Sequence, residues 1–170
     1  TGYRPANQGN AVQIDERGNY ASPSPVTDGK RVVFFFGNGD LAAFDMRGNP
    51  LWKRNLQKEN GDFCFNWTFS SSPVLYEGKL YMQILQRNQV VGGRGRENSA
   101  SYLMTLNPDT GKEIWRAERP TNAVNESMEA YSTPIPYEYN GRKEILIAGG
   151  DYLTGHDPAN GKELWRWGTW

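Results

Sequence analysis

The chain carries few residues whose types and spacing would build a catalytic or metal site. It has one cysteine, Cys64, and one histidine, His156, so it can form neither an internal disulfide nor a Cys/His zinc cluster. Two related segments place Phe44 and Leu106 where His156 stands, which favours a packed, hydrogen-bonded histidine over a ligand. Cys64 lies between two phenylalanines, which favours a buried apolar side chain over a reactive thiol.

An aromatic segment and a glycine-arginine segment are the two candidates for a binding surface. Phe63, Phe65 and Trp67 belong to the densest aromatic stretch, which is interpreted either as a core contact or as a surface for a peptide or sugar. Arg94 and Arg96 stand among closely spaced glycines, but without a complete dinucleotide fingerprint or a strand-turn-helix context. We interpret this segment as a solvated loop, with a recognition loop as the functional alternative.

Composition and charge exclude several classes of protein. The chain has 19 basic and 19 acidic residues and a net charge of 0, which argues against a nucleic-acid binder or an anionic-membrane binder. The longest apolar run, at residues 32–36, is far too short to span a bilayer as a helix. With 19 glycines and 10 prolines, the 170 residues suit many short strands joined by tight turns, which predicts an all-β chain.

Three copies of one motif organise the chain. Each copy ends in a tryptophan, and these are Trp52, Trp115 and Trp165. A turn precedes each tryptophan, with the residues Asp45 and Gly48, Asn107 and Gly111, and Asp157 and Gly161. Asx side chains accept hydrogen bonds from backbone N–H groups two residues ahead, and glycine supplies the positive φ of a tight hairpin. A Ser/Thr-Pro-Val/Ile element with its own glycine turn lies upstream in every copy, so both hairpins of the unit are repeated.

Each unit predicts a four-stranded antiparallel meander, and three such units predict blades of a β-propeller. The predicted blades span residues 22–56, 70–117 and 131–170. The second blade contains an inserted loop at 86–100, which accounts for its greater length. Residues 1–21 are interpreted as a lead-in or as the outer strand of a preceding blade.

Three blades are too few to close a ring, because propellers close with about four to eight. Two blade faces are therefore left without a neighbour. We expect the chain to be a fragment of a longer propeller, with a self-assembling part-propeller as the alternative. The partners of the open faces are then the remaining blades of the same chain or another copy of it.

The repeated pattern Leu-x-x-x-Asp-x-x-x-Gly-Lys-Glu-x-Trp, with the Ser-Ser-Pro-Val element before it, resembles the repeat of the pyrroloquinoline quinone (PQQ)-like β-propellers. That family includes the quinoprotein dehydrogenases and the propeller lipoprotein of the bacterial outer-membrane barrel-assembly machinery. The resemblance covers about residues 22–165. It implies that Trp52, Trp115 and Trp165 pack between adjacent blades, each with its indole N–H bonded to backbone.

The resemblance also implies what a catalytic member would require. A quinoprotein holds PQQ between an aromatic ring and, in many members, a disulfide of adjacent cysteines, beside a calcium ion and an aspartate base. The adjacent cysteine pair is missing from this sequence. Acidic and amide residues do occur on the inter-blade connections, without the spacing of a calcium loop, and they are Asp62, Asn66, Asn125, Glu126 and Glu129.

These observations favour a non-catalytic propeller that acts as a binding or assembly scaffold for a protein or glycan partner. The alternative is part of a PQQ- and calcium-dependent oxidoreductase whose cofactor site lies mostly on other blades. The resemblance further implies a secreted or periplasmic bacterial protein. No catalytic residue is assigned from the sequence.

Overall fold

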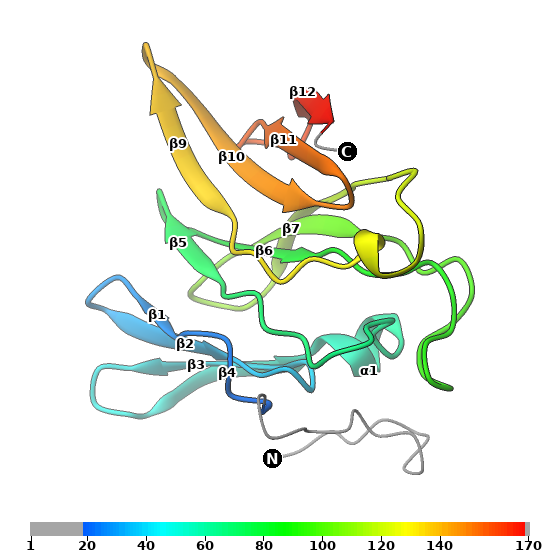
Figure 1. Ribbon diagram of the computed structural model, residues 1–170. Helices are drawn as coiled ribbons and strands as arrows, with labels where there is room; N and C mark the ends of the chain where they lie inside the picture. The colour runs from blue at the N-terminus through cyan, green and yellow to red at the C-terminus, as the bar shows by residue number, and fades with distance from the viewer. Residues whose placement is uncertain (1–18, 169–170) are drawn as a thin grey trace.

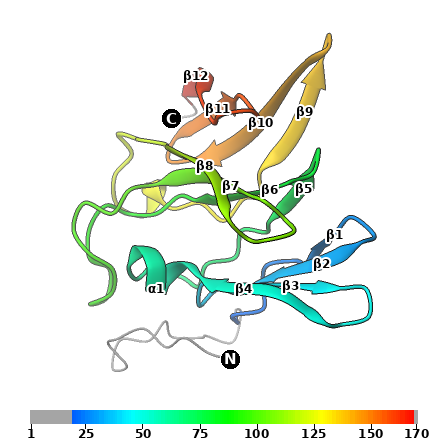
Figure 2. The ribbon, with the colours of Figure 1, turned by 180° about the vertical axis from the view of Figure 1, so that it is seen from behind.

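The computed structural model describes residues 19–168 of the chain, so the interpretation of residues 1–21 falls almost wholly outside the described residues. Within them, the chain forms three four-stranded antiparallel sheets, in which strands pair only with their neighbours in sequence. The sheets are stacked in chain order, with the second between the other two (Figure 1, Figure 2). The prediction of an all-β chain with about three propeller blades is confirmed.

The three blades share one backbone plan. Blade one contains β1 (Val26–Thr27), β2 (Arg31–Phe35), β3 (Asp40–Asp45) and β4 (Pro50–Asn55). Blade two contains β5 (Val74–Tyr76), β6 (Lys79–Ile84), β7 (Tyr102–Leu106) and β8 (Glu113–Glu118). Blade three contains β9 (Ile135–Tyr139), β10 (Arg142–Gly149), β11 (Tyr152–His156) and β12 (Glu163–Gly168). In every blade the pairing of the last two strands shifts register at the same point, just before the connecting turn.

The turns before the repeat tryptophans form as their residue types predict. Asp45 accepts hydrogen bonds from the backbone N–H groups of Arg47 and Asn49, each at 2.8 Å. Asn107 and Asp157 likewise bond to N–H groups two residues ahead. The glycine of each turn adopts a positive φ, of 85°, 68° and 78° at Gly48, Gly111 and Gly161.

Two apolar layers hold the blades together. Side chains alternate between the two faces of a strand, so one face of blade two meets blade one and the other meets blade three. The first layer includes Val33, Phe35 and Leu41 of blade one with Leu80, Met82 and Met104 of blade two. The second layer includes Tyr81 and Leu103 of blade two with Ile145 and Ile147 of blade three.

The connections between blades and the inserted loop share one end of the molecule. Helix α1 (Leu56–Asn60), the 3-10 helix η2 (Asn125–Met128) and the loop at 86–100 lie at this end, opposite the β3–β4 turn (Figure 1). Asn55 caps α1 by accepting a hydrogen bond from the backbone N–H of Lys58 at 2.8 Å. Neither helix of residues 19–168 is long and apolar enough to cross a membrane.

Candidate functional site

The first repeat tryptophan joins blade one to blade two. The Nε1 of Trp52 donates a hydrogen bond to the carbonyl oxygen of Pro108, at 2.8 Å. Its ring lies against Gly111, where an added Cβ would come within 2.6 Å of the ring carbons. The Asx-Gly turn of blade two therefore packs on the indole ring of Trp52 in blade one. Gly111 has a positive φ and no room for a Cβ, so glycine is required at this position.

The second repeat tryptophan makes the same contact without its hydrogen bond. A Cβ on Gly161 would lie 2.5 Å from the ring of Trp115, so the blade-three turn seats on this ring. The carbonyl oxygen of Pro158 instead accepts from the Tyr81 hydroxyl at 3.2 Å and from Lys79 Nζ at 3.1 Å. The buried Nε1 of Trp115 has no hydrogen-bond partner within residues 19–168.

The third repeat tryptophan is bound within its own blade. The Nε1 of Trp165 donates to Oε2 of Glu144 at 2.5 Å. The ring lies over Gly155, where a Cβ would be 2.3 Å from Nε1. In blades one and two the position of Gly155 is taken by Ala43 and Thr105, each paired with a repeat tryptophan. Only blade three of the described blades therefore has a glycine beneath its tryptophan ring.

His156 and Cys64 are both buried. His156 Nδ1 lies 3.0 Å from the carbonyl oxygen of Gly161, and Nε2 lies 2.9 Å from the Thr154 hydroxyl. The carbonyl can only accept, so Nδ1 carries the proton and Nε2 accepts. Burial is the main cause of the lowered pKa of His156. The Cys64 thiol contacts the Ser99 hydroxyl at 3.2 Å.

Only part of the predicted aromatic surface is accessible. Phe63 and Phe65 are buried in the layer between blades one and two, where both pack against Phe69. Trp67 is 49% exposed, and its Nε1 donates to Glu126 Oε1 at 2.8 Å. The part of this surface that a partner could reach is therefore centred on Trp67.

The two arginines of the inserted loop differ in their contacts. Arg94 is buried, and its Nη2 donates to the carbonyl oxygen of Phe65 at 3.0 Å. Burial is also the main cause of the lowered pKa of Arg94. Arg96 packs over Gly61, and its carbonyl oxygen accepts from the Ser99 hydroxyl at 2.9 Å. The Arg94 side chain therefore fastens the inserted loop to the connection between blades one and two.

A buried carboxylate joins three connections at this end of the molecule. Glu129 accepts hydrogen bonds from the backbone N–H of Asn66, at 3.0 Å to each carboxylate oxygen. It also forms an ion pair with Arg87 and a hydrogen bond with the Tyr131 hydroxyl. Burial and the hydrogen bond to Glu129 raise the pKa of Tyr131. The structure thus brings Asn66, Glu126 and Glu129 of the predicted acidic and amide group near one another through Trp67 and Arg87.

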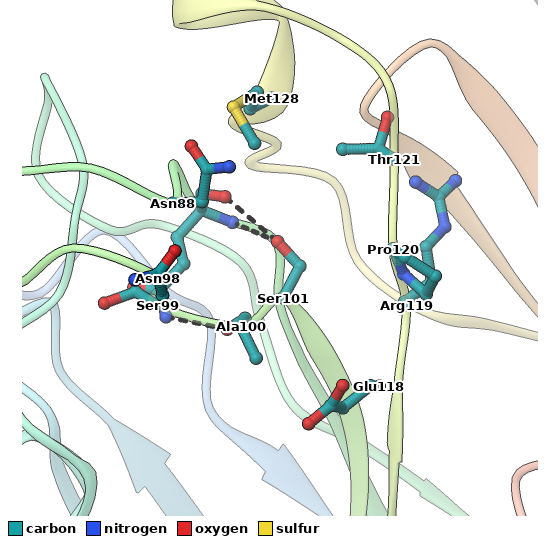
Figure 3. A pocket seen from close by; sticks show the side chains of 11 residues that line it. Asn88, Asn98, Ser99, Ala100, Ser101, Glu118, Arg119, Pro120, Thr121 and Met128 are labelled. Atoms are coloured by element: carbon teal, nitrogen blue, oxygen red, sulfur yellow. Dashed lines mark hydrogen bonds between the residues drawn. The ribbon is translucent and has the colours of Figure 1, made fainter.

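A polar pocket opens beside this network, with a volume of about 280 Å³. One wall comes from the inserted loop, and the other from the segment that leaves β8. Figure 3 shows Asn88, Asn98 and Ser99 across the hollow from Pro120 and Thr121. The structure describes no hydrogen-bond partner for the side-chain amides of Asn88 and Asn98 within residues 19–168, so both are available to a bound group.

Arg119 makes the second wall rigid. The side chain is 1% exposed and turns toward blade three, where Nη2 donates to the carbonyl oxygen of Tyr152 at 2.8 Å. Its Nε lies 3.4 Å from the Thr154 hydroxyl, which also contacts His156. Burial is the main cause of the lowering of the Arg119 pKa to about 10. The guanidinium of Arg119 therefore holds blade three, and the exposed carboxylate of Glu118 is a charged group of this wall.

The acidic side chains of the described blades do not gather into a metal-binding cluster. No group of three or more His, Cys, Asp and Glu side chains in residues 19–168 could hold a metal ion. Glu126 and Glu129 are occupied by Trp67, Arg87 and backbone N–H. The arrangement at this end of the molecule offers hydrogen bonds and shape.

Neither a protein-family model nor a curated protein matches the chain. Solved structures do match its fold. A quinohemoprotein alcohol dehydrogenase from Pseudomonas putida HK5, ADHIIG, has a TM-score of 0.56 at 14% identity, over 85% of this chain and 26% of that chain. The quinohemoprotein alcohol dehydrogenase from Comamonas testosteroni has a TM-score of 0.56 at 13% identity, over 94% of this chain and 30% of that chain.

BamB from Moraxella catarrhalis has a TM-score of 0.50 at 15% identity, over 92% of this chain and 40% of that chain. The chain thus spans less than half the length of each of these structures. The predicted resemblance to PQQ-type propellers is confirmed at the level of the fold. At these identities the likeness says nothing of activity.

Proposed function

We propose that the chain is a binding scaffold, in which stacked propeller blades present the polar pocket to a protein or glycan partner. The observation that carries this proposal is the pocket lining, which combines amides and hydroxyls around Asn88, Asn98 and Thr121 with the carboxylate of Glu118. Amides and hydroxyls that donate and accept, beside a carboxylate that accepts, suit a ligand rich in hydroxyl or amide groups. Met128 adds an apolar contact at one side.

The way the pocket is built supports recognition rather than catalysis. One wall is the inserted loop, which blades one and three lack, and loops added to a repeated scaffold carry much of the specificity of such proteins. The charged groups nearby, Arg87, Arg119 and Glu129, are each bound by protein partners. A partner would therefore meet amide and hydroxyl groups held by the surrounding blades, with the exposed carboxylate of Glu118 beside them.

Trp67 extends this binding surface on the neighbouring connection. Its indole is held by Glu126 across the boundary between blades and leaves half of its surface exposed. A fixed aromatic face is a favourable contact for a sugar ring or a peptide side chain. The family resemblance also supports a location in the periplasm or outside the cell.

Backbone amide chemical shifts, followed during titration with chitotriose and separately with an uncharged Ser-Asn-Ala-Gly peptide, test the proposal. We expect one ligand to perturb residues 86–88, 98–101 and 118–121 together. Asn88→Ala should weaken that binding about 3- to 10-fold, the value of one hydrogen bond. Asn160→Ala, the same substitution in the turn of blade three, should leave it unchanged.

A different result would favour the oxidoreductase alternative. Oxidation of alcohols or sugars with an artificial electron acceptor, after PQQ and Ca²⁺ are added to the protein as its source makes it, would overturn the proposal. A perturbation confined to other surfaces, or equal losses in both variants, would show that the pocket is not the binding site.

A further inference from the structure

One charged side chain of the polar pocket has no protein partner that neutralises it. Glu118, the last residue of β8, lines the pocket and is exposed. None of the ion pairs formed within residues 19–168 includes its carboxylate. A carboxylate in this state accepts hydrogen bonds from water, and a bound cation can replace that water.

The other charged residue of the pocket lining turns away from the hollow. Arg119 is 1% exposed, and its Nη2 donates to the carbonyl oxygen of Tyr152 at 2.8 Å. Figure 3 shows the carboxylate of Glu118 on the side of the inserted loop, while the guanidinium of Arg119 points away from it. A ligand in the pocket therefore contacts the carboxylate directly and cannot reach the guanidinium.

The exposed charges around the pocket are mostly negative. Glu97 of the inserted loop and Glu126 of η2 are exposed carboxylates like Glu118, whereas Arg96 is the exposed cation of residues 86–101 and 118–131. Carboxylates gathered around a hollow raise the local concentration of cations and repel anions. The pocket and its surroundings therefore favour a ligand with a positive charge.

The wall opposite Glu118 requires a second kind of group on the ligand. Asn88 and Asn98 line the pocket there, and each side-chain amide can both donate and accept a hydrogen bond. Hydroxyl groups satisfy such amides because they also donate and accept. The volume of about 280 Å³ is at the small end for ligand pockets, which suits one ring-sized group. The ligand should thus combine an ammonium group and several hydroxyls on one compact ring.

A lysine side chain meets only the first of these requirements. Its ammonium group stands at the end of four CH₂ groups, which form no hydrogen bonds. In the pocket that stem would displace water from the amides of Asn88 and Asn98 without replacing their hydrogen bonds, which is unfavourable. A sugar ring with an amino group carries the ammonium and the hydroxyls within a few bonds of one another. The lining therefore favours an amino sugar over a lysine-containing peptide.

We propose that the pocket binds an amino sugar whose amino group is free and protonated. The ammonium group would donate to the carboxylate of Glu118, and ring hydroxyls would bond to Asn88 and Asn98. The inference rests on the proposed function of this pocket and adds to it the charge and the class of the ligand. N-acetylation of the sugar removes the charge, so the acetylated sugar loses the charge-assisted bond to Glu118.

Two trimers that differ only at nitrogen, the glucosamine trimer and its N-acetylated form, test the inference. Backbone amide chemical shifts are followed at low salt and pH 5.5, where amines and glutamate carboxylates are charged. We expect the glucosamine trimer to bind at residues 86–88, 98–101 and 118–121 about 3- to 5-fold more tightly than the acetylated trimer. Glu118→Gln should make the two affinities equal. Glu138→Gln, at an exposed carboxylate on β9 outside the pocket, is the matched control and should keep the preference.

The possible failures separate this inference from the proposed function. Equal binding of the two trimers at the pocket would overturn the inference and leave the proposed function intact. A preference for the glucosamine trimer that Glu118→Gln leaves unchanged would do the same. Tighter binding of an N-acetylated Ser-Lys-Ala-Gly peptide at these residues would assign the carboxylate to a lysine side chain instead. Perturbation of these residues by neither trimer and neither peptide would overturn the proposed function, and the inference with it.

Discussion

The indole N–H of Trp52 donates to the carbonyl oxygen of Pro108, 56 residues further along the chain, while the equivalent N–H of Trp115 has no partner within residues 19–168. In both cases the indole ring nevertheless packs against the turn glycine of the following blade. The ring contact, rather than the hydrogen bond, is therefore the part of the docking that the two blade boundaries share.

Replacing Trp115 with alanine should destabilise the fold by about 3–5 kcal/mol, because it opens a cavity between blades two and three. Trp115→Phe should cost less, since it keeps most of the ring and removes an N–H that forms no bond to described residues. Chemical denaturation gives both values. An unfolding midpoint for Trp115→Ala equal to that of the parent would refute the docking role.

Trp52→Phe should be more costly than Trp115→Phe by about 1 kcal/mol. The first substitution leaves the Pro108 carbonyl without its indole donor, and the second breaks no hydrogen bond to a described residue. Denaturation of the two variants side by side measures the difference. Equal losses would mean that the Trp52 hydrogen bond contributes nothing to the boundary.

Gly161→Ala should destabilise the chain more than Gly48→Ala. Both glycines have a positive φ, of 78° and 85°, so the backbone strain of roughly 1–2 kcal/mol is common to the two. Only at Gly161 would the new Cβ also strike a tryptophan, at 2.5 Å from Trp115. Thermal unfolding of the two variants separates the strain from the clash, and identical melting temperatures would contradict the packing of Gly161 on Trp115.

His156 should make the fold less stable in mild acid. Its pKa is lowered in the folded chain, so below about pH 6.5 the unfolded chain binds the proton first and is favoured. Above that pH the group is neutral in both states and contributes no slope. Urea denaturation between pH 7.5 and 5 measures the effect. His156→Leu, which copies Leu106 at the same place in blade two, should reduce the slope, and an unchanged slope would exclude this residue as its source.

Tyr131 should resist ionisation at high pH. Burial and Glu129 raise its pKa, so the unfolded chain ionises first and stability falls as the pH rises above about 10. Tyr131→Phe should leave the absorbance titration of the folded chain unchanged up to pH 11. Tyr139→Phe, which removes an exposed phenol, is the matched control. A loss of amplitude in Tyr131→Phe would show that the phenol is accessible.

The blades could be predicted because their signals are local. The turn at Asp157 and Gly161 depends on two side-chain properties within five residues, a bond to nearby N–H groups and a permissive φ. The occurrence of that turn in three copies then predicted a fold of repeated blades. Helix α1 was not predicted, since its five residues are too short to show a periodic pattern.

The pocket could not be predicted because its walls are distant in sequence. Asn88 and Thr121 face each other only after the inserted loop folds back over the connection to blade three (Figure 3). The position of Arg119 directly after β8, at the end where that loop begins, was the one available signal. Burial of Phe63 and Phe65 likewise follows from their packing with Phe69, which the aromatic composition alone does not reveal.

Strand order within the sheets bears on how the protein is made. Each sheet pairs strands in the order in which they leave the ribosome, so a blade needs no residue that has yet to be synthesised to complete its hydrogen bonds. The face that packs against the following blade, however, stays exposed to solvent until that blade has been synthesised. The growing chain therefore always exposes one apolar blade face near its C-terminal end. A pause in translation between two blades prolongs this exposure and favours misassembly.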